Sequence, residues 1–160
     1  MKAALSVVMA AIVHCTFAAV FTNDGVRLEF DAAGRVASLK ECASGRELLR
    51  AKRPFVLVQH EKGKYELPSS FACEGSRLRY FFAKSDSRLE FDIEKFDGGW
   101  TFTFAGSDKL DKAREICVCD LAPVCTNNLG VYANMFSDDA SGVCLRAYDL
   151  PLGKIGRAHV

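Results

Sequence analysis

Residues 77–106 read RLRYFFAKSDSRLEFDIEKFDGGWTFTFAG, and their pattern decides the fold. Apolar and polar side chains alternate through three runs, which is the period of a β-strand with one buried face. Polar turns at 84–87 and 97–99 separate the runs, and the glycines of the second turn suit a tight hairpin. We therefore expect a three-stranded antiparallel meander. Its three buried rows are Leu78, Tyr80 and Phe82; Leu89, Phe91 and Ile93; and Trp100, Phe102 and Phe104.

The same alternation occurs closer to the N-terminus. Residues 26–31 place Val, Leu and Phe between charged residues, and residues 35–41 resume the alternation after a short turn, which predicts a β-hairpin. The string RLEFD occurs both at 27–31 and at 88–92. Two strands that share one inside-outside pattern produce such a coincidence, so it indicates no duplicated domain. We expect the acidic residues of both copies to face solvent.

The remaining segments favour short strands over helices. PFVLVQ (54–59) is a continuous apolar run typical of a strand covered on both faces. SDKLDKARE (107–115) is the one stretch with helical character, and it is too short to be stable alone. ICVCDLAPV (116–124) returns to strand. About ten short strands with almost no helix predict an all-β fold, an antiparallel β-sandwich, with a closed barrel as the alternative.

Both ends of the chain differ from this β-rich middle. Lys2, an apolar core over 3–13, and small residues at Thr16 and Ala18 predict a signal peptide cleaved after Ala18. The final KIGRAHV (154–160) reverse-translates to AAG ATC GGA AGA GCA CAC GTC, which resembles a sequencing-adaptor oligonucleotide. We therefore expect residues 1–18 to be a signal peptide, 19–153 a β-sandwich domain truncated at its C-terminal end, and 154–160 a non-native tail.

A signal peptide predicts a secreted, periplasmic or cell-surface protein. Two alternatives are lipidation of Cys15 and an uncleaved anchor over 3–21. His14 argues against both, because a lipidated cysteine follows a small residue and a polar residue interrupts an apolar span. We expect no membrane contact after cleavage.

Charge and histidine content exclude several function classes. The chain has 21 basic and 20 acidic residues, a formal net charge of +1, and no basic stripe, so nucleic acid is not an expected partner. Of its three histidines only His60 lies in the predicted domain, which could supply at most one residue to a histidine-based triad or metal site. We expect His60 to be a surface residue or a core residue with satisfied hydrogen bonds.

The predicted domain contains six cysteines. In an exported chain they suggest disulfides, with 15 possible pairings, and burial as free thiols is the alternative. A zinc site would need ligand pairs with two residues between them, a spacing that the sequence lacks, so we expect neither a metal nor another cofactor. The six are Cys42, Cys73, Cys117, Cys119, Cys125 and Cys144.

The most polar segment is TNNLGVYANMFSDDASG (126–142), which predicts a long loop, or two loops around a short strand. Sugar binding needs an aromatic ring to cover the CH face of a pyranose, and amides or carboxylates to bind its hydroxyls. The segment holds both kinds of group, although a loop with only a structural role is the alternative. Trp100, another ring, is expected in the core. The candidate binding residues are Asn127, Asn128, Tyr132, Asn134, Phe136, Asp138 and Asp139.

No catalytic residue is assigned. Glycosidic hydrolysis needs two carboxyl groups that face each other across the bond. Asp138 and Asp139 are adjacent, and adjacent strand side chains point in opposite directions, so they form a poor pair. Calcium binding by the same residues has no spaced ligand pattern to support it.

NDGVRLEFDAAGRVASLKECASGREL (23–48) resembles the opening of the galactose-mutarotase-like supersandwich domains of secreted carbohydrate-active enzymes. The matching features are Asn23, a strand ending in Phe30-Asp31, Gly34, a second strand ending in Ser38-Leu39, and the segment 44–48. The resemblance implies an accessory, substrate-framing domain placed before the catalytic domain of a glycoside hydrolase or lyase-like protein. It carries over no catalytic residue, because catalytic carboxylates in such proteins commonly lie further along the chain.

The expected partners are therefore a polysaccharide or oligosaccharide and a C-terminal catalytic domain that this chain lacks. On this interpretation the parent is a glycoside hydrolase-like enzyme and the fragment is not catalytic by itself. Two other interpretations stay open. One is a stand-alone carbohydrate-binding or adhesion domain, and the other is a structural module of the cell envelope.

Overall fold

The computed structural model of the chain describes residues 17–125, 127–128, 134–137 and 142–145. Over these residues the fold is all-β, with sixteen strands and no helix. The sheets are antiparallel and pack in a sandwich-like arrangement, which confirms the predicted fold class.

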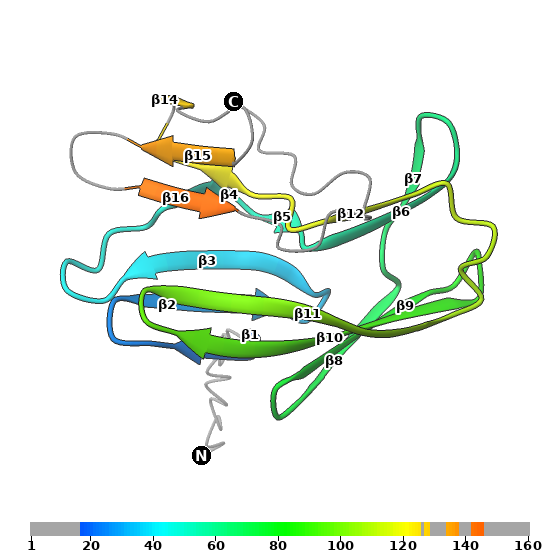
Figure 1. Cartoon of the computed structure of the whole chain (residues 1–160), viewed down its shortest axis with the longest axis horizontal. Helices are drawn as coiled ribbons and strands as arrows, with labels where there is room; N and C mark the ends of the chain where they lie inside the picture. Colours follow the sequence, from blue (N-terminus) through cyan, green and yellow to red (C-terminus); the bar gives the residue numbers. More distant parts are fainter. Residues whose placement is uncertain (1–16, 126, 129–133, 138–141, 146–160) are drawn as a thin grey trace, which may run out of the picture.

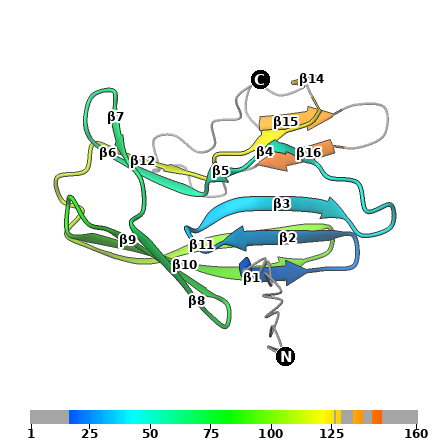
Figure 2. The same ribbon diagram turned by 180° about the vertical axis from the view of Figure 1, so that it is seen from behind.

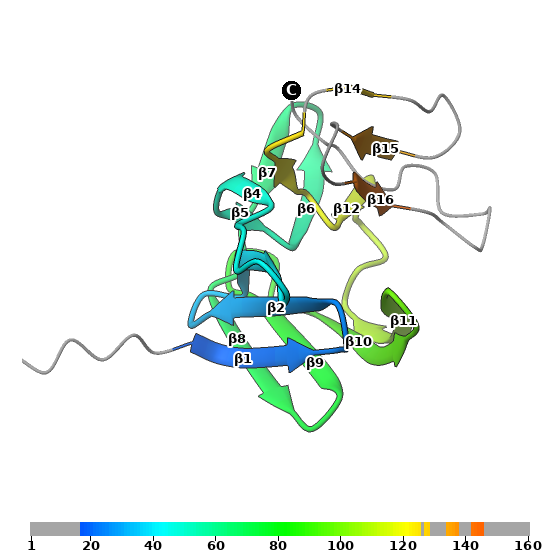
Figure 3. The same cartoon turned by 90° about the vertical axis from the view of Figure 1, so that its left-hand side faces the viewer.

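Two sheets with four described strands each form the larger part of the molecule. The first has the order β1 (Phe17–Thr22), β2 (Val26–Asp31), β3 (Arg35–Glu41) and β5 (Arg53–Pro54). The second has the order β11 (Gly99–Asp108), β10 (Ser87–Phe96), β9 (Arg77–Phe82) and β8 (Ser70–Glu74). Figure 3 shows β1 and β2 running across the direction of β8 and β9.

Three smaller sheets complete the described part of the chain. They are β12 (Glu115–Val118) with β6 (Val56–Glu61) and β7 (Lys64–Glu66); β13 (Ala122–Pro123) with β4 (Leu49–Ala51); and β14 (Asn127–Asn128) with β15 (Asn134–Ser137) and β16 (Gly142–Leu145). These sheets lie on one side of the two four-stranded sheets, with β6 and β7 at one end of the molecule and β15 and β16 at the other (Figures 1 and 2).

Phe55 lies at the centre of the hydrophobic core, between β5 and β6. Its ring centroid is 5.5 Å from that of Phe30 on β2 and 5.9 Å from that of Phe91 on β10, both edge to face. The Phe55 ring also stacks on Tyr80 of β9 at 6.0 Å. Such offset and edge-to-face pairs stabilise a core beyond their area burial. The first sheet, the second sheet and β6 therefore share one core.

The predicted meander is confirmed as β9, β10 and β11, and the predicted first hairpin as β2 and β3. The first two rows of the meander are buried as expected. In the third row Trp100 and Phe102 are only half-buried, and Phe104 is 48% exposed. The expectation for Phe104 is wrong: β11 is an edge strand that pairs only with β10 among the described residues, and Phe104 in its middle keeps about half of its surface exposed.

The helical character predicted for 107–115 is not found. Strand β11 extends to Asp108, and the chain then turns, with the amide of Ala113 donating to the carbonyl of Leu110 at 2.9 Å, before β12 begins at Glu115. The segment lies between two strands that pair with different sheets, so tertiary pairing overrides its weak local preference.

Glu29 is a further correction, because it is buried rather than facing solvent, with 3% of its surface exposed. The pairing of β2 with β3 shifts register between Glu29 and Phe30, and three consecutive residues of β2 are buried there. Such a bulge breaks the strict alternation of a strand. The guanidinium of Arg27 lies 2.8 Å from the Glu29 carboxylate and neutralises it.

Strand β1 begins at Phe17, so its first two residues belong to the segment predicted as signal peptide. Residues 1–16 and 146–160, with most of the predicted signal peptide and the whole predicted tail, lie outside the described residues. Within the described part, no helix is long and apolar enough to cross a membrane.

Candidate functional site

The structure brings part of the predicted polar site into one small sheet. Asn127 and Asn128 form β14, which pairs with β15, the strand that contains Asn134 and Phe136. The sequence predicted either one long loop over residues 126–142 or two loops around a short strand, and β15 is a short strand inside this segment. Tyr132, Asp138 and Asp139 lie outside the described residues. As a sugar-binding site, this set stays a prediction.

A pocket of about 650 Å³ opens at the other end of the molecule, and we call it the lysine pocket. Three segments line it: the β6–β7 hairpin, the β9–β10 turn and the connection from β11 to β12 (Figure 1). Its described lining residues are His60, Glu61, Lys64, Tyr65, Glu66, Lys84, Ser85, Lys109 and Lys112.

The hairpin sequence HEKGKYE explains the first wall of the lysine pocket. Gly63 has a φ of +80°, the backbone conformation that the tight turn between β6 and β7 requires and that glycine adopts without strain. In the pairing of the two strands, Gln59 is opposite Tyr65 and Glu61 is opposite Lys64, so His60 is left without a cross-strand partner. A bulge of this kind redirects a side chain, here the imidazole that lines the pocket.

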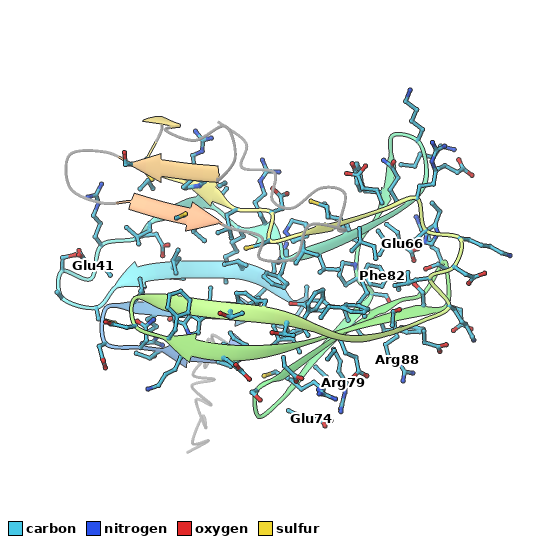
Figure 4. The ribbon with its side chains drawn as sticks, in the orientation of Figure 1. Glu41, Glu66, Glu74, Arg79, Phe82 and Arg88 are labelled. Atoms are coloured by element: carbon cyan, nitrogen blue, oxygen red, sulfur yellow. The ribbon has the colours of Figure 1, made fainter. Side chains whose placement is uncertain are left out.

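Glu66 connects this hairpin to the second wall. Its side chain is buried, and its Oε1 accepts the backbone amides of Lys84 at 2.7 Å and Ser85 at 3.3 Å in the β9–β10 turn. Its Oε2 lies 3.4 Å from Nε2 of His60. Figure 4 shows Glu66 at the end of the molecule where β6 and β7 lie. These contacts hold two separate segments at a fixed spacing, so Glu66 builds the pocket.

Tyr65 is the aromatic residue of the lysine pocket. It is half-buried, and its hydroxyl donates to Oε1 of Glu115 on β12 at 3.3 Å. This hydrogen bond spans two strands that flank β6 on opposite sides. It restricts the orientation of the Tyr65 ring at the pocket wall.

Two of the pocket lysines form ion pairs. The Lys64 ammonium lies 2.6 Å from Glu61, and the Lys109 ammonium donates to Asp86 in the β9–β10 turn. The Lys109 hydrogen bond lowers the pKa of Asp86, and the same contact raises the pKa of Lys109. Both groups therefore stay charged, and the pair links the β11–β12 connection to the turn.

The other two lysines are not neutralised. Among the described residues, no carboxylate lies within 4.0 Å of the ammonium groups of Lys84 and Lys112. With Asp86 counted as the partner of Lys109, the four lining lysines face three carboxylates, a formal excess of one positive charge. The pocket is therefore locally basic, although the chain as a whole is close to neutral.

The chemistry that this arrangement supports is binding. A hydrolytic pair needs one carboxyl group that protonates the leaving-group oxygen. The other carboxylate attacks the sugar carbon or activates a water molecule. Glu66 already accepts two amides and faces His60, and Glu61 is paired with Lys64. The ammonium, imidazole and aromatic groups around them are suited to hold a polar ligand.

His60 is half-buried and lines the lysine pocket. The lysines were not predicted as a site. They come from three separate stretches of the sequence, at 64, 84 and 109–112, and each lies in or beside a turn. The closest sequence signal was the KGK turn of the hairpin, which indicates a turn and not a ligand site.

The cysteines do not form a second site. No disulfide joins the six described cysteines, and burial is the alternative that the structure shows for Cys117 and Cys125. Burial raises the pKa of Cys119 to about 12, which makes it a poor nucleophile because the thiolate is the reactive form. The described residues contain no group of three or more His, Cys, Asp or Glu that could hold a metal ion.

Comparisons of the chain with models of protein families, with curated proteins and with solved structures found no match.

Proposed function

We propose that this chain is a glycan-binding, accessory β-domain of a secreted carbohydrate-active protein, and that it binds sugar in the lysine pocket. The observation that carries the proposal is the pocket itself, in which an oriented tyrosine ring lies among several hydrogen-bond donors on an antiparallel scaffold. Secretion and a partner catalytic domain belong to the same proposal. They are supported by the signal-like residues 1–18 and by the resemblance of residues 23–48.

The residue types of the pocket fit a sugar better than an apolar ligand. A pyranose presents a CH face that an aromatic ring can cover, and hydroxyls that need donors and acceptors. Tyr65 supplies the ring, while the ammonium groups of Lys84 and Lys112 each have three donors without a carboxylate partner among the described residues. Because Tyr65 is already held by Glu115, little side-chain entropy is lost when a ligand covers its ring.

An accessory role is favoured over catalysis by the contacts of the pocket carboxylates. Glu66 is engaged in fixing the β9–β10 turn, and replacing its amide contacts with a substrate contact would release that turn. The sheet of β14, β15 and β16, which contains the described part of the predicted polar segment, is a second candidate surface at the other end of the molecule (Figure 1). Its binding role is independent of the lysine pocket and can be tested separately.

The test is retention of the full chain by a panel of immobilised polysaccharides, followed by dissociation constants for those that bind. Tyr65→Ala should weaken binding about two- to tenfold, since an aromatic contact contributes roughly 0.5–1.5 kcal/mol. Tyr65→Phe keeps the ring and should bind nearly as well as the unaltered chain. Phe96→Ala is the matched control, because Phe96 is an exposed ring outside the pocket.

Equal binding by the Tyr65→Ala variant and the unaltered chain would remove the pocket from the proposal. A loss in Phe96→Ala instead would place the site on another surface. If no polysaccharide in a broad panel retains the folded chain, the glycan-binding function is wrong. Circular dichroism of each variant shows whether a loss of binding reflects unfolding.

A further inference from the structure

We propose that the lysine pocket selects acidic glycans, and that Lys84 and Lys112 bind the anionic substituent, a carboxylate or a sulfate. This inference rests on the glycan-binding function and adds the chemical class of the ligand. It follows from the charges left over once every ion pair around the pocket has been assigned.

Three carboxylates at the pocket already have partners. Glu61 neutralises Lys64, and Asp86 neutralises Lys109. Glu66 accepts two backbone amides and faces His60. Among the described residues this leaves the ammonium groups of Lys84 and Lys112 without a carboxylate. An anion placed between them would complete the charge balance that the protein leaves open.

Both lysines stand on backbone that is fixed by other contacts. The amide of Lys84 donates to the Glu66 carboxylate, which holds the β9–β10 turn against the hairpin. Lys112 lies in a turn closed by the hydrogen bond from Ala113 to Leu110, and the neighbouring Lys109 is attached to Asp86 of the β9–β10 turn. Lys84 and Lys112 therefore line the same pocket from segments that are linked to each other. Such preorganisation lowers the entropy that binding an anion costs.

A second hollow on the molecule allows a comparison. A pocket of about 380 Å³ on the face of β8, β9 and β10 is lined by Arg79 and Arg88 with Glu90. There Arg79 lies 2.5 Å from Glu74 and 3.4 Å from Glu90, so its charge is balanced by protein carboxylates. Figure 4 shows Glu74, Arg79 and Arg88 along the same edge of the molecule. Among the described residues Arg88 has no ion pair, so this pocket has one cation without a carboxylate, whereas the lysine pocket has two.

An acidic sugar fits the pocket better than a nucleic acid. Binding of a nucleic-acid backbone draws on a row of phosphate contacts along a basic surface. Two lysines without a carboxylate partner in the described part of the chain, in a pocket that also contains Glu61 and Glu66, do not form such a row. A single carboxylate or sulfate beside a ring and hydroxyl groups needs only the contacts that the pocket offers.

The experiment measures dissociation constants of the full chain for matched polysaccharides. Polygalacturonate and its methyl ester share a backbone and differ in the charge of the carboxyl group, and dextran sulfate and dextran differ in the sulfate. We expect the chain to prefer the charged member of at least one pair. Preference in the first pair identifies a carboxylate ligand, and preference in the second a sulfate ligand. Raising the salt concentration should weaken this binding, because both lysines are exposed to solvent.

The decisive variant is Lys84→Gln with Lys112→Gln. Its matched control is Lys40→Gln with Lys52→Gln, which removes the same charge from two exposed lysines outside the pocket. The pocket variant should bind the preferred polyanion at least about tenfold more weakly, whereas the control should change by less than about twofold. Binding of the neutral polysaccharide by the pocket variant should fall less than binding of the polyanion, because glutamine still donates hydrogen bonds to sugar hydroxyls but carries no charge.

Four results would overturn the inference in different ways. Equal losses in the pocket and control variants would show a general charge effect. Equal affinity for charged and neutral members of both pairs would remove the anion preference and leave glycan binding intact. Single-stranded DNA binding as tightly as the polyanions would show an unspecific cation site. Failure to bind any of the four polysaccharides would reject the anion site, and failure on a broader neutral panel as well would also reject the proposed function.

Discussion

The pentapeptide RLEFD occupies two strands of this molecule, β2 at residues 27–31 and β10 at residues 88–92, and its two copies have different surroundings. The apolar positions behave alike, since leucine and phenylalanine of both copies are buried in the shared core. Alternation of apolar and polar residues is thus enough to fix which face of a strand turns inward. These buried residues are Leu28 and Phe30 in the first copy, and Leu89 and Phe91 in the second.

The charged positions of the two copies differ. Glu29 is buried and pairs with Arg27 of its own strand, whereas Glu90 is half-buried and lies 3.6 Å from Arg77 and 3.4 Å from Arg79 of the neighbouring strand β9. The same pentapeptide therefore forms an ion pair within one strand in the first copy and a network of ion pairs between two strands in the second. The difference shows that the partners of a polar residue depend on its neighbouring strand and not on its own sequence.

The last residue of the pentapeptide differs most. Asp31 ends its strand, and its Oδ1 accepts the amides of Ala33 at 3.0 Å and Arg35 at 3.1 Å in the following turn. Asp92 lies within a strand that continues to Phe96, and it binds Arg77 through two hydrogen bonds of 2.8 and 2.7 Å. One aspartate closes a turn and the other joins two strands.

The largest effect should come from removing the two buried rings. Phe30→Ala should lower the free energy of unfolding by about 3–5 kcal/mol, because Phe30 is fully buried and its ring contacts Phe21, Phe55 and Phe71. Phe91→Ala should lie at the lower end of that range. Its neighbour Phe104 is half-exposed and can move into part of the space that Phe91 leaves.

Urea unfolding under reducing conditions measures both effects. Phe104→Ala is the control, since a half-exposed ring loses less burial and should cost clearly less than either core substitution. A loss of less than about 1 kcal/mol for Phe30→Ala would contradict its place at the centre of the core.

A smaller effect should come from the turn that follows the first copy. Gly34 has a φ of +70°, and a Cβ added there would lie 2.6 Å from Cε1 of Tyr80. Gly34→Ala should therefore lower the free energy of unfolding by about 2–4 kcal/mol, the sum of backbone strain and overpacking. Gly45 has the same φ and no atom within 4 Å of its added Cβ, so Gly45→Ala should cost only about 1–2 kcal/mol.

The difference between the two glycine variants isolates the contact with Tyr80. It can be measured as the shift in urea midpoint at unchanged slope. Equal losses would mean that the turn moves away from Tyr80 at little cost, and the close packing of the first copy on β9 would then be unimportant for stability.

The fold was predictable where one strand face is buried throughout. In β2, β3, β9 and β10 the alternation of apolar and polar residues predicts which face is buried. Turn-forming residues connect these strands into hairpins. Strands β7 and β8 were missed. Strand β7 is only three residues long. In β8 the small residues Ala72 and Cys73 make the alternation of apolar and polar residues hard to recognise. The burial of Glu29 and the exposure of Phe104 depend on a bulge and on the sheet edge, which no local pattern contains.

The lysine pocket was not predictable in the same way. Its lining residues come from three segments that are at least 18 residues apart, and the packing of the β6–β7 hairpin against the β9–β10 turn brings two of them together. Charge balance is also a property of the folded state. The sequence contains nearly equal numbers of basic and acidic residues, and only the observed ion pairs show which lysines are left without a partner.

The smallest effect concerns the aspartate of the second copy. The hydrogen bond from Arg77, together with its positive charge, lowers the pKa of Asp92 below its ordinary value. Because the folded pKa is the lower one, the pair contributes its full stabilisation above about pH 4, and this contribution is lost as the pH falls through the lowered value.

In an NMR titration of the Asp92 carboxyl carbon, Arg77→Gln should raise the midpoint towards that of an ordinary aspartate, while Arg88→Gln should leave it unchanged. Both groups of the pair are accessible to solvent, so the effect on stability at neutral pH should be small. If Arg77→Gln does not move the midpoint of Asp92, the Arg77–Asp92 ion pair is not maintained in solution. The contrast between the charged residues of the two copies would then be limited to Glu29.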